Sequence, residues 1–177
     1  MNAFVLMALV PVALLAGSAI GARRQRLDPR TDLGLQLPTA RQAAVALLLF
    51  LLLSTASELL YRHWALQPTG EPWHLRYSPP ALAVRLAFVA LVFPVAEEIF
   101  FRGFLFGALG RRWGDLVAIA GSSVLFAALH LQYDLRGMAL VFADAIFFAL
   151  VRARTRSTLL TIALHMLGNG YAAWQRY

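Results

Sequence analysis

Two adjacent carboxylates and an arginine interrupt an apolar stretch near the middle of the chain. Between Ala81 and Gly107, Glu97, Glu98 and Arg102 are charged, whereas nearly all the remaining residues are Ala, Val, Leu, Phe, Gly or Pro. A charged side chain at membrane depth costs roughly 2.5–3.5 kcal/mol on insertion scales. Three charges within six positions therefore need partners, and they indicate a function.

The spacing of these three residues separates their roles. Glu98 and Arg102 are four residues apart, so on a helix they share a face and can form an ion pair. Glu97 is five residues from Arg102, which places it roughly 140° around the helix axis at 100° per residue. We infer that Glu98 and Arg102 hold each other and that Glu97 is free to do chemistry. The alternative is that Glu97 is a second partner of Arg102.

Two further polar pairs lie in apolar segments nearer the C-terminus. Phe126 and His130 are four residues apart, as are His165 and Asn169. If the helices close with these faces inward, Glu97, both histidines and the asparagine form one polar cluster. The alternative for a single intramembrane His or Asn is interhelical packing, worth only about 0.6–2 kcal/mol.

One more carboxylate, Asp144, lies inside a later apolar segment. We expect it to pair with a nearby arginine rather than to join the cluster.

The composition indicates that these residues sit on membrane helices. The chain has 177 residues, of which 60% are hydrophobic and 14% charged, and its mean hydropathy is +0.65. Soluble domains carry about 25% charged residues. We therefore predict an all-α fold, a polytopic membrane helical bundle of about six transmembrane helices. With no cysteine, disulfide and thiolate chemistry is excluded.

The apolar segments divide the chain into two parts. We predict that residues 1–80 form two N-terminal transmembrane helices and an interfacial loop, and that residues 81–177 form a core of four transmembrane helices. The six predicted spans are Met1–Gly21, Thr39–Leu60, Ala81–Gly107, Asp115–Leu131, Gly137–Val151 and Ser157–Trp174.

The positive charge of the chain is distributed unevenly among the connections. All basic residues other than histidine are arginines, and the net charge is +7. The loops after the first, third and fifth spans carry five, two and three arginines, ten in all, against four in the other loops and the tail. Arginines gathered between apolar spans indicate topology and contact with lipid headgroups rather than a nucleic-acid partner. The odd loops are expected to be cytoplasmic, with the first span an uncleaved anchor whose N-terminus lies outside.

Together the three motifs resemble those of a known family. Glu97-Glu98-x-x-x-Arg102, Phe126-x-x-x-His130 and His165-x-x-x-Asn169 are similar to the motifs of the CPBP family of intramembrane proteases. That family includes the CAAX prenyl endopeptidases of the Rce1 type and the bacterial Abi proteins. The resemblance covers about Ala81 to Trp174, just over half of the chain.

The resemblance implies roles for the motif residues. Glu97 and His130 would position the hydrolytic water, and His165 and Asn169 would donate hydrogen bonds to the developing oxyanion. Glu98 and Arg102, with Phe126 in support, would hold the first helix and orient Glu97, or clamp the substrate backbone. The expected substrate is a membrane-anchored protein or peptide, and the expected location is a bacterial inner membrane.

Metal use and overall function each leave an alternative open. Glu97, His130 and His165 could hold zinc with water in the fourth position, but the chain has no H-E-x-x-H motif, and we favour a metal-free mechanism. The alternatives to a protease are a non-catalytic immunity or scaffold protein of the same fold and a proton-coupled transporter. Transporters usually show paired repeats and broken helices, and the sequence shows neither.

Overall fold

A computed structural model describes residues 3–66 and 71–177 of the chain, and all the regular structure within these ranges is helical. The predicted all-α fold is confirmed. Residues 1 and 2 of the first predicted span and residues 67–70 of the predicted interfacial loop lie outside the described part. The helices are α1 (Ala3–Gln25), α2 (Ala40–His63), α3 (Trp73–Arg76), α4 (Pro79–Ala87), η1 (Phe88–Val92), α5 (Phe93–Glu98), η2 (Ile99–Leu105), α6 (Phe106–Trp113), α7 (Asp115–Ala128), α8 (Leu135–Thr155) and α9 (Thr158–Gln175).

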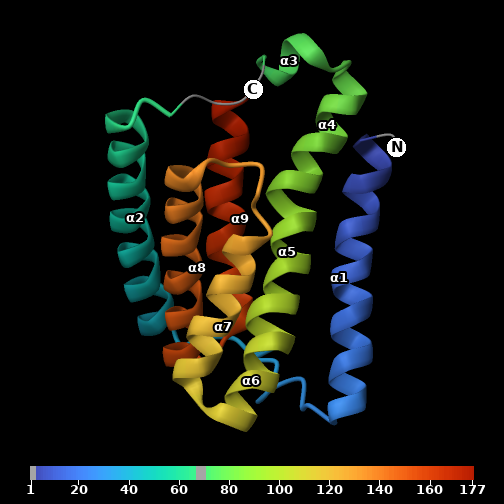
Figure 1. Ribbon diagram of the computed structural model, residues 1–177, viewed down its shortest axis with the longest axis vertical. Helices are drawn as coiled ribbons and strands as arrows, with labels where there is room; N and C mark the ends of the chain where they lie inside the picture. The colour runs from blue at the N-terminus through green and yellow to red at the C-terminus, as the bar shows by residue number, and fades with distance from the viewer. Residues whose placement is uncertain (1–2, 67–70) are drawn as a thin grey trace.

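The long helices run up and down the bundle in alternation. The connections after α1, α6 and α8 lie at one end, and those after α2 and α7 lie at the other (Figure 1). We call the first the arginine end (residues 26–39, 114 and 156–157) and the second the turn end (residues 64–66 and 129–134). The alternation agrees with the predicted succession of spans, while the side of the membrane that each end faces stays a prediction.

Glu97 and Glu98 lie in one continuous helix from residue 79 to residue 113, which contains two π-helical turns. In η1 the N–H of Phe93 bonds to the carbonyl of Phe88, and after η2 the N–H of Phe106 reaches the carbonyl of Phe101. Both are bonds to the fifth preceding residue, the pattern of a π-helix. The helix continues to Trp113 instead of ending near Gly107 as predicted.

The predicted helix limits hold at some ends and fail at another. Thr39, where the second predicted span begins, caps α2, because its side chain accepts from the N–H of Gln42 while the Gln42 side chain accepts from the N–H of Thr39. In contrast, α7 ends at Ala128, three residues before the end of the predicted span. His130 therefore lies in the turn after the helix, and the prediction that it lies within a helix is wrong.

Within residues 3–66 and 71–177, three helices are long and apolar enough to cross a membrane. They are Met7–Gln25, Ala40–His63 and Pro79–Trp113, whereas Asp115–Ala128 is apolar but shorter. These correspond to the first three predicted spans. The full count of six crossings stays a prediction.

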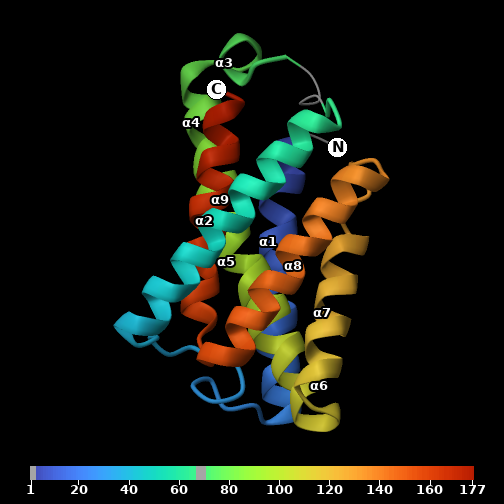
Figure 2. The same ribbon diagram turned by 90° about the vertical axis from the view of Figure 1, so that its left-hand side faces the viewer.

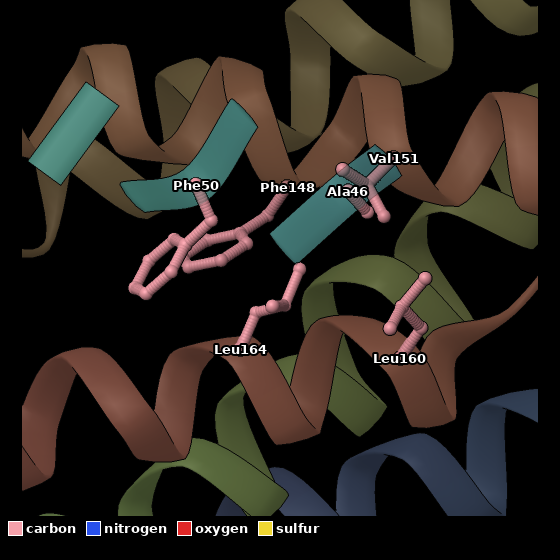
Figure 3. Packing of buried hydrophobic residues seen from close by; sticks show 6 residues of the cluster. All are labelled: Ala46, Phe50, Phe148, Val151, Leu160 and Leu164. Carbon is pink, nitrogen blue, oxygen red and sulfur yellow. The ribbon is translucent and has the colours of Figure 1, made fainter. Parts of the chain in front are cut away.

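A hydrophobic cluster joins α2, α8 and α9 and sets the register of α8 against α9. Figure 2 shows α2 running obliquely over α9. Figure 3 shows the side chains that meet there: Ala46, Phe50, Phe148, Val151, Leu160 and Leu164. Because Phe148 belongs to this cluster, its ring is held where it stacks on His165 of α9.

At the arginine end, the loop between α1 and α2 is bound through its backbone carbonyls. The buried Arg152 of α8 donates from Nη2 to the carbonyls of Thr31 (3.4 Å) and Asp32 (2.7 Å). The Thr158 hydroxyl donates to the Leu33 carbonyl (2.6 Å), and the Thr158 N–H donates to the Gly34 carbonyl (2.8 Å). The loop is therefore fixed to the start of α9 and the end of α8.

Gly34 is needed at the centre of this loop. Its φ of +65° lies in the left-handed region. A Cβ placed there would come within 2.5 Å of Nε of Arg152. The close approach lets the loop backbone lie against the guanidinium.

Candidate active site

Glu98 and Arg102 form the buried ion pair that their spacing predicts. Arg102 Nη1 lies 3.1 Å from Glu98 Oε1, and both side chains are 0% exposed. Arg102 also donates from Nη2 to the Ala145 carbonyl of α8 at 3.0 Å. Its guanidinium lies over the Phe126 ring at 4.5 Å. The arginine thus ties the helix of the carboxylates to α8 and α7.

His165 contacts both carboxylates. Its Nδ1 lies 3.0 Å from Glu98 Oε1, and its Nε2 lies 3.7 Å from Glu97 Oε2. Since an ionised carboxylate only accepts, Nδ1 carries the hydrogen that is donated to Glu98, and Nε2 is left facing Glu97. The Glu98 contact was not expected from the sequence, because 67 residues separate the two groups.

Aromatic rings fix the orientation of the His165 imidazole. It stacks on Phe148 with ring centroids 5.2 Å apart, and Phe126 approaches it edge-on at 6.0 Å. The imidazole therefore has one preferred rotamer and, through Glu98, one preferred tautomer.

Glu97 differs from Glu98 in both exposure and partners. Its side chain is 17% exposed, and it makes no ion pair with Arg102, so the alternative pairing is not found. Its one polar contact among the described residues is with His165. The separation of 3.7 Å is too long for a direct hydrogen bond. A water molecule beside the pair could reach both atoms at hydrogen-bond distance.

His130 lies near the site but does not meet Glu97. Its Nδ1 donates to the Phe126 carbonyl (2.8 Å), which is the acceptor that its own backbone N–H would use if α7 continued. Its ring lies 4.7 Å from Phe126 and stacks on Tyr133. No contact within the described residues joins it to Glu97. The predicted four-residue cluster is thus incomplete. Because α7 ends early, His130 does not reach Glu97, and the Phe126 ring contacts both His130 and His165.

Asn169 shares a face of α9 with His165, as predicted, but its amide has a backbone partner. Nδ2 donates to the Val89 carbonyl of η1 at 3.0 Å. One of its two N–H groups is therefore already engaged.

Asp144 makes no direct hydrogen bond or ion pair within the described residues, since Arg102 donates to the carbonyl of the next residue, Ala145. Arg102 and His165 are nevertheless near enough to interact with its charge, so its pairing with an arginine stays a prediction.

A zinc site is not formed by this arrangement. Within residues 3–66 and 71–177 no three His, Asp or Glu side chains are arranged to hold a metal ion. Arg102 and His165 already bind the same carboxylate oxygen, Glu98 Oε1, and His130 lies apart. The cavity found at the arginine end, about 180 Å³ and lined by residues such as Arg111, Asp115 and Arg156, is not next to Glu97. The metal-free mechanism that we favour from the sequence therefore stays a prediction.

The fold and the site together define a class: helical membrane proteins with a buried carboxylate, arginine and histidine site on their inner helices. Residues 78–171 match the model of the type II CAAX prenyl endopeptidase Rce1-like family. The chain belongs to this Rce1-like family.

Two curated bacterial relatives align with about half of the chain. "Putative membrane peptidase YdiL" of Bacillus subtilis (strain 168) is 33% identical over 91 residues, which are 51% of this chain and 36% of that protein. "Membrane-embedded CAAX protease MroQ" of Staphylococcus aureus (strain USA300) is 29% identical over 96 residues, 51% of this chain and 38% of that protein. The alignments thus span little more than a third of these relatives. No solved structure gives a significant match.

Proposed function

We propose that the chain is an intramembrane endopeptidase that hydrolyses a peptide bond in a membrane-anchored protein or peptide. The observation that carries the proposal is the asymmetry of the carboxylates around His165. Glu98 is fully buried and compensated by Arg102, while Glu97 is partly exposed and makes its one direct polar contact among the described residues with His165. One carboxylate is suited to orientation and the other to proton transfer.

The geometry supports the following reaction. Glu97 takes a proton from a water molecule placed between it and His165 Nε2, and the water oxygen attacks the substrate carbonyl carbon. The tetrahedral intermediate then loses the amine as the C–N bond breaks. The proton held by Glu97 passes to that amine, so the products are a carboxylic acid and an amine, and transfer of the acid's proton leaves a carboxylate and an ammonium group.

Glu98 and Arg102 act through His165 in this proposal. Glu98 accepts from Nδ1, which holds the Nε2 lone pair toward the water. Arg102 keeps Glu98 ionised in an apolar setting by compensating its charge. His130 has its tautomer fixed by the Phe126 carbonyl, with Nε2 unoccupied. It is proposed to contact the substrate or the water once the substrate is bound.

Terminal proteomics tests the proposal. Membranes from cells with the active protein and with the Glu97→Gln variant are compared for new protein termini. Glu58→Gln is the matched control, because Glu58 lies at the end of α2 and bonds to Arg62 and Gln175. We expect termini that vanish in Glu97→Gln, with the uncut precursor accumulating and with normal insertion of the variant.

Other results would favour the other functions. Termini unchanged in Glu97→Gln would exclude Glu97 as the base. Loss of ion-coupled flux without any change in termini would favour a proton-coupled transporter, and an unaltered phenotype would favour a scaffold. Cleavage abolished by a chelator and restored by zinc would show that the mechanism is not metal-free.

A further inference from the structure

Two π-helical turns bracket Glu97 and Glu98, and each has a carbonyl bound by a side chain from another helix. In η1 the Val89 carbonyl accepts from Asn169 Nδ2 of α9 at 3.0 Å. In η2 the Arg102 carbonyl accepts from Arg152 Nε of α8 at 3.1 Å. The short helix α5 between the turns carries both carboxylates.

The Val89 carbonyl needs a donor from outside its own helix. In an α-helix it would accept from the N–H of Phe93, but that N–H bonds to Phe88. In a π-turn it would accept from residue 94, which is a buried proline without an N–H. An unpaired carbonyl away from water costs free energy comparable to a lost hydrogen bond. Asn169 supplies the missing donor.

The position of this bond relates it to the site. Pro94 precedes Glu97 by three residues, less than one helical turn, so the rotation of α5 at this point sets the direction of Glu97. Asn169 follows His165 by four residues on the same face of α9. One helix therefore holds both the imidazole and the carbonyl that anchors the start of α5.

We propose that Asn169 is a positioning residue, whose amide holds the η1 turn so that Glu97 faces His165 Nε2. This inference rests on the proposed function for its link to cleavage. It differs from the oxyanion-donor role that the sequence resemblance implies, in which the Asn169 amide would act on the substrate directly.

A rescue experiment separates the two roles. Asn169→Leu keeps a similar volume but removes the donor. Pro94→Ala restores an N–H that can donate to the Val89 carbonyl, directly in a π-turn or by a return to α-helical bonding through Phe93. If Asn169 acts by holding that carbonyl, Pro94→Ala makes its amide dispensable. If Asn169 acts on the substrate, a backbone N–H at residue 94 cannot replace it.

The first arm measures the thermal unfolding midpoint of purified protein in detergent micelles, with every variant built in the Glu97→Gln background. We expect Asn169→Leu to lower the Tm by about 2–10 °C and the double variant to return to the value of Pro94→Ala alone. No Tm effect of Asn169→Leu, or no return in the double variant, would overturn the proposal. Should Asn169→Leu fail to fold, recovery of monodisperse double variant takes the place of the Tm, and its absence counts against the proposal.

The second arm measures cleavage, with the Glu97-dependent terminus from the proteomic comparison as the readout. Asn169→Leu should lower the rate by about 10–100-fold, the size expected for a displaced catalytic group. The double variant should recover to the level of Pro94→Ala. A loss that persists undiminished in the Pro94→Ala background would assign Asn169 to the substrate instead. The Tm measurements involve no cleavage. If the chain proves not to be a peptidase, they therefore still test whether Asn169 holds the η1 turn.

Discussion

The two ends of the bundle are built in different ways. At the arginine end, carbonyls from Thr31 to Gln36 accept hydrogen bonds from α8, α9 and the residues that join them, and Arg152 is almost fully buried among them. At the turn end, the described link between the two turns is exposed: Arg136 donates to the Trp64 carbonyl at 3.5 Å. Large apolar side chains of the turn and its flanks are open to the surroundings there: Leu129, Leu131, Tyr133 and Leu135.

This difference shows how the helix that carries Glu97 and Glu98 can be held rigidly while the nearby turn end stays open to its surroundings. Arg152 anchors the carboxylate helix from the arginine end, and the buried Arg102 ties the middle of that helix to α8. His130 belongs to the loosely tied end, where local opening costs little. We therefore expect substitutions at the arginine end to change stability, and substitutions at the turn end to change cleavage with little change in stability.

The largest expected effect is that of Arg102→Met. It leaves Glu98 fully buried without a compensating charge, which should lower the free energy of unfolding by about 3–5 kcal/mol. Thermal unfolding in detergent micelles measures the loss. Arg62→Gln is the control, because the Arg62 side chain is 72% exposed and pairs with Glu58 on the surface. Its loss should change the free energy of unfolding only slightly. Equal losses in the two variants would contradict the comparison.

The next effect tests the contact between the loop and Arg152. Gly34→Ala and Gly114→Ala both place an alanine at positive φ, but only the first puts its Cβ against the guanidinium, since nothing lies within 4 Å of the Cβ position at Gly114. We expect about 1–3 kcal/mol for Gly114→Ala from backbone strain alone, because its φ of +85° and ψ of 170° lie in a region that only glycine readily adopts. Gly34→Ala should cost at least about 3 kcal/mol, because hydrogen bonds of Arg152 break as well. Denaturant titration in micelles gives both values.

At the turn end, His130→Gln sharpens the contrast between stability and activity. The variant loses the ring contact with Phe126 and the bond to its carbonyl, so the free energy of unfolding should fall by no more than about 1 kcal/mol. Cleavage of the substrate should fall by about 10²-fold or more if His130 contacts the reacting groups. Cleavage at the wild-type rate would show that the turn end takes no part in the reaction.

The smallest expected effect concerns Asp28, in the loop of the arginine end. The N–H and hydroxyl of Thr31, with the N–H of Arg30, lower the pKa of Asp28 below its ordinary value. A carboxylate with a lowered folded-state pKa adds stability above its unfolded pKa of about 3.9, and that stability is lost as the pH falls further. Asp28→Asn should therefore narrow the difference in Tm between pH 6 and pH 3, and thermal unfolding of both proteins at the two pH values measures it.

Spacing within one helix could be predicted from the sequence, whereas contacts between helices could not. The pairing of Glu98 with Arg102 and the Thr39 cap follow from local rules, and both are found. The bond from His165 to Glu98 depends on how α9 packs against α5. The spacing of residues within either helix does not predict that packing. At the early end of α7, the His130 ring donates to the Phe126 carbonyl, which the backbone N–H of His130 would use if the helix continued. The apolar run of the sequence therefore extends past the end of the helix.

The π-turns mark the limit of periodicity arguments. The rotation of 100° per residue that holds in an α-helix does not hold across η1 and η2. Pro94 is a signal in the sequence that a carbonyl one turn earlier lacks a donor. Likewise, charge counting assigns Arg152 to a cytoplasmic loop, but it is buried within α8. Charge counting cannot separate an arginine that faces lipid headgroups from one that binds a backbone.

A π-turn holds one more residue than the α-helical turn it replaces, and this bears on how the family tolerates changes in length. Removing a single residue from 99–105 would let that stretch wind as an ordinary α-helix, with the segments on either side keeping their own neighbours. Single-residue gaps in alignments of this helix among relatives should therefore cluster in η1 and η2 and spare α5. Such gaps would be a record of where the helix has been lengthened during evolution.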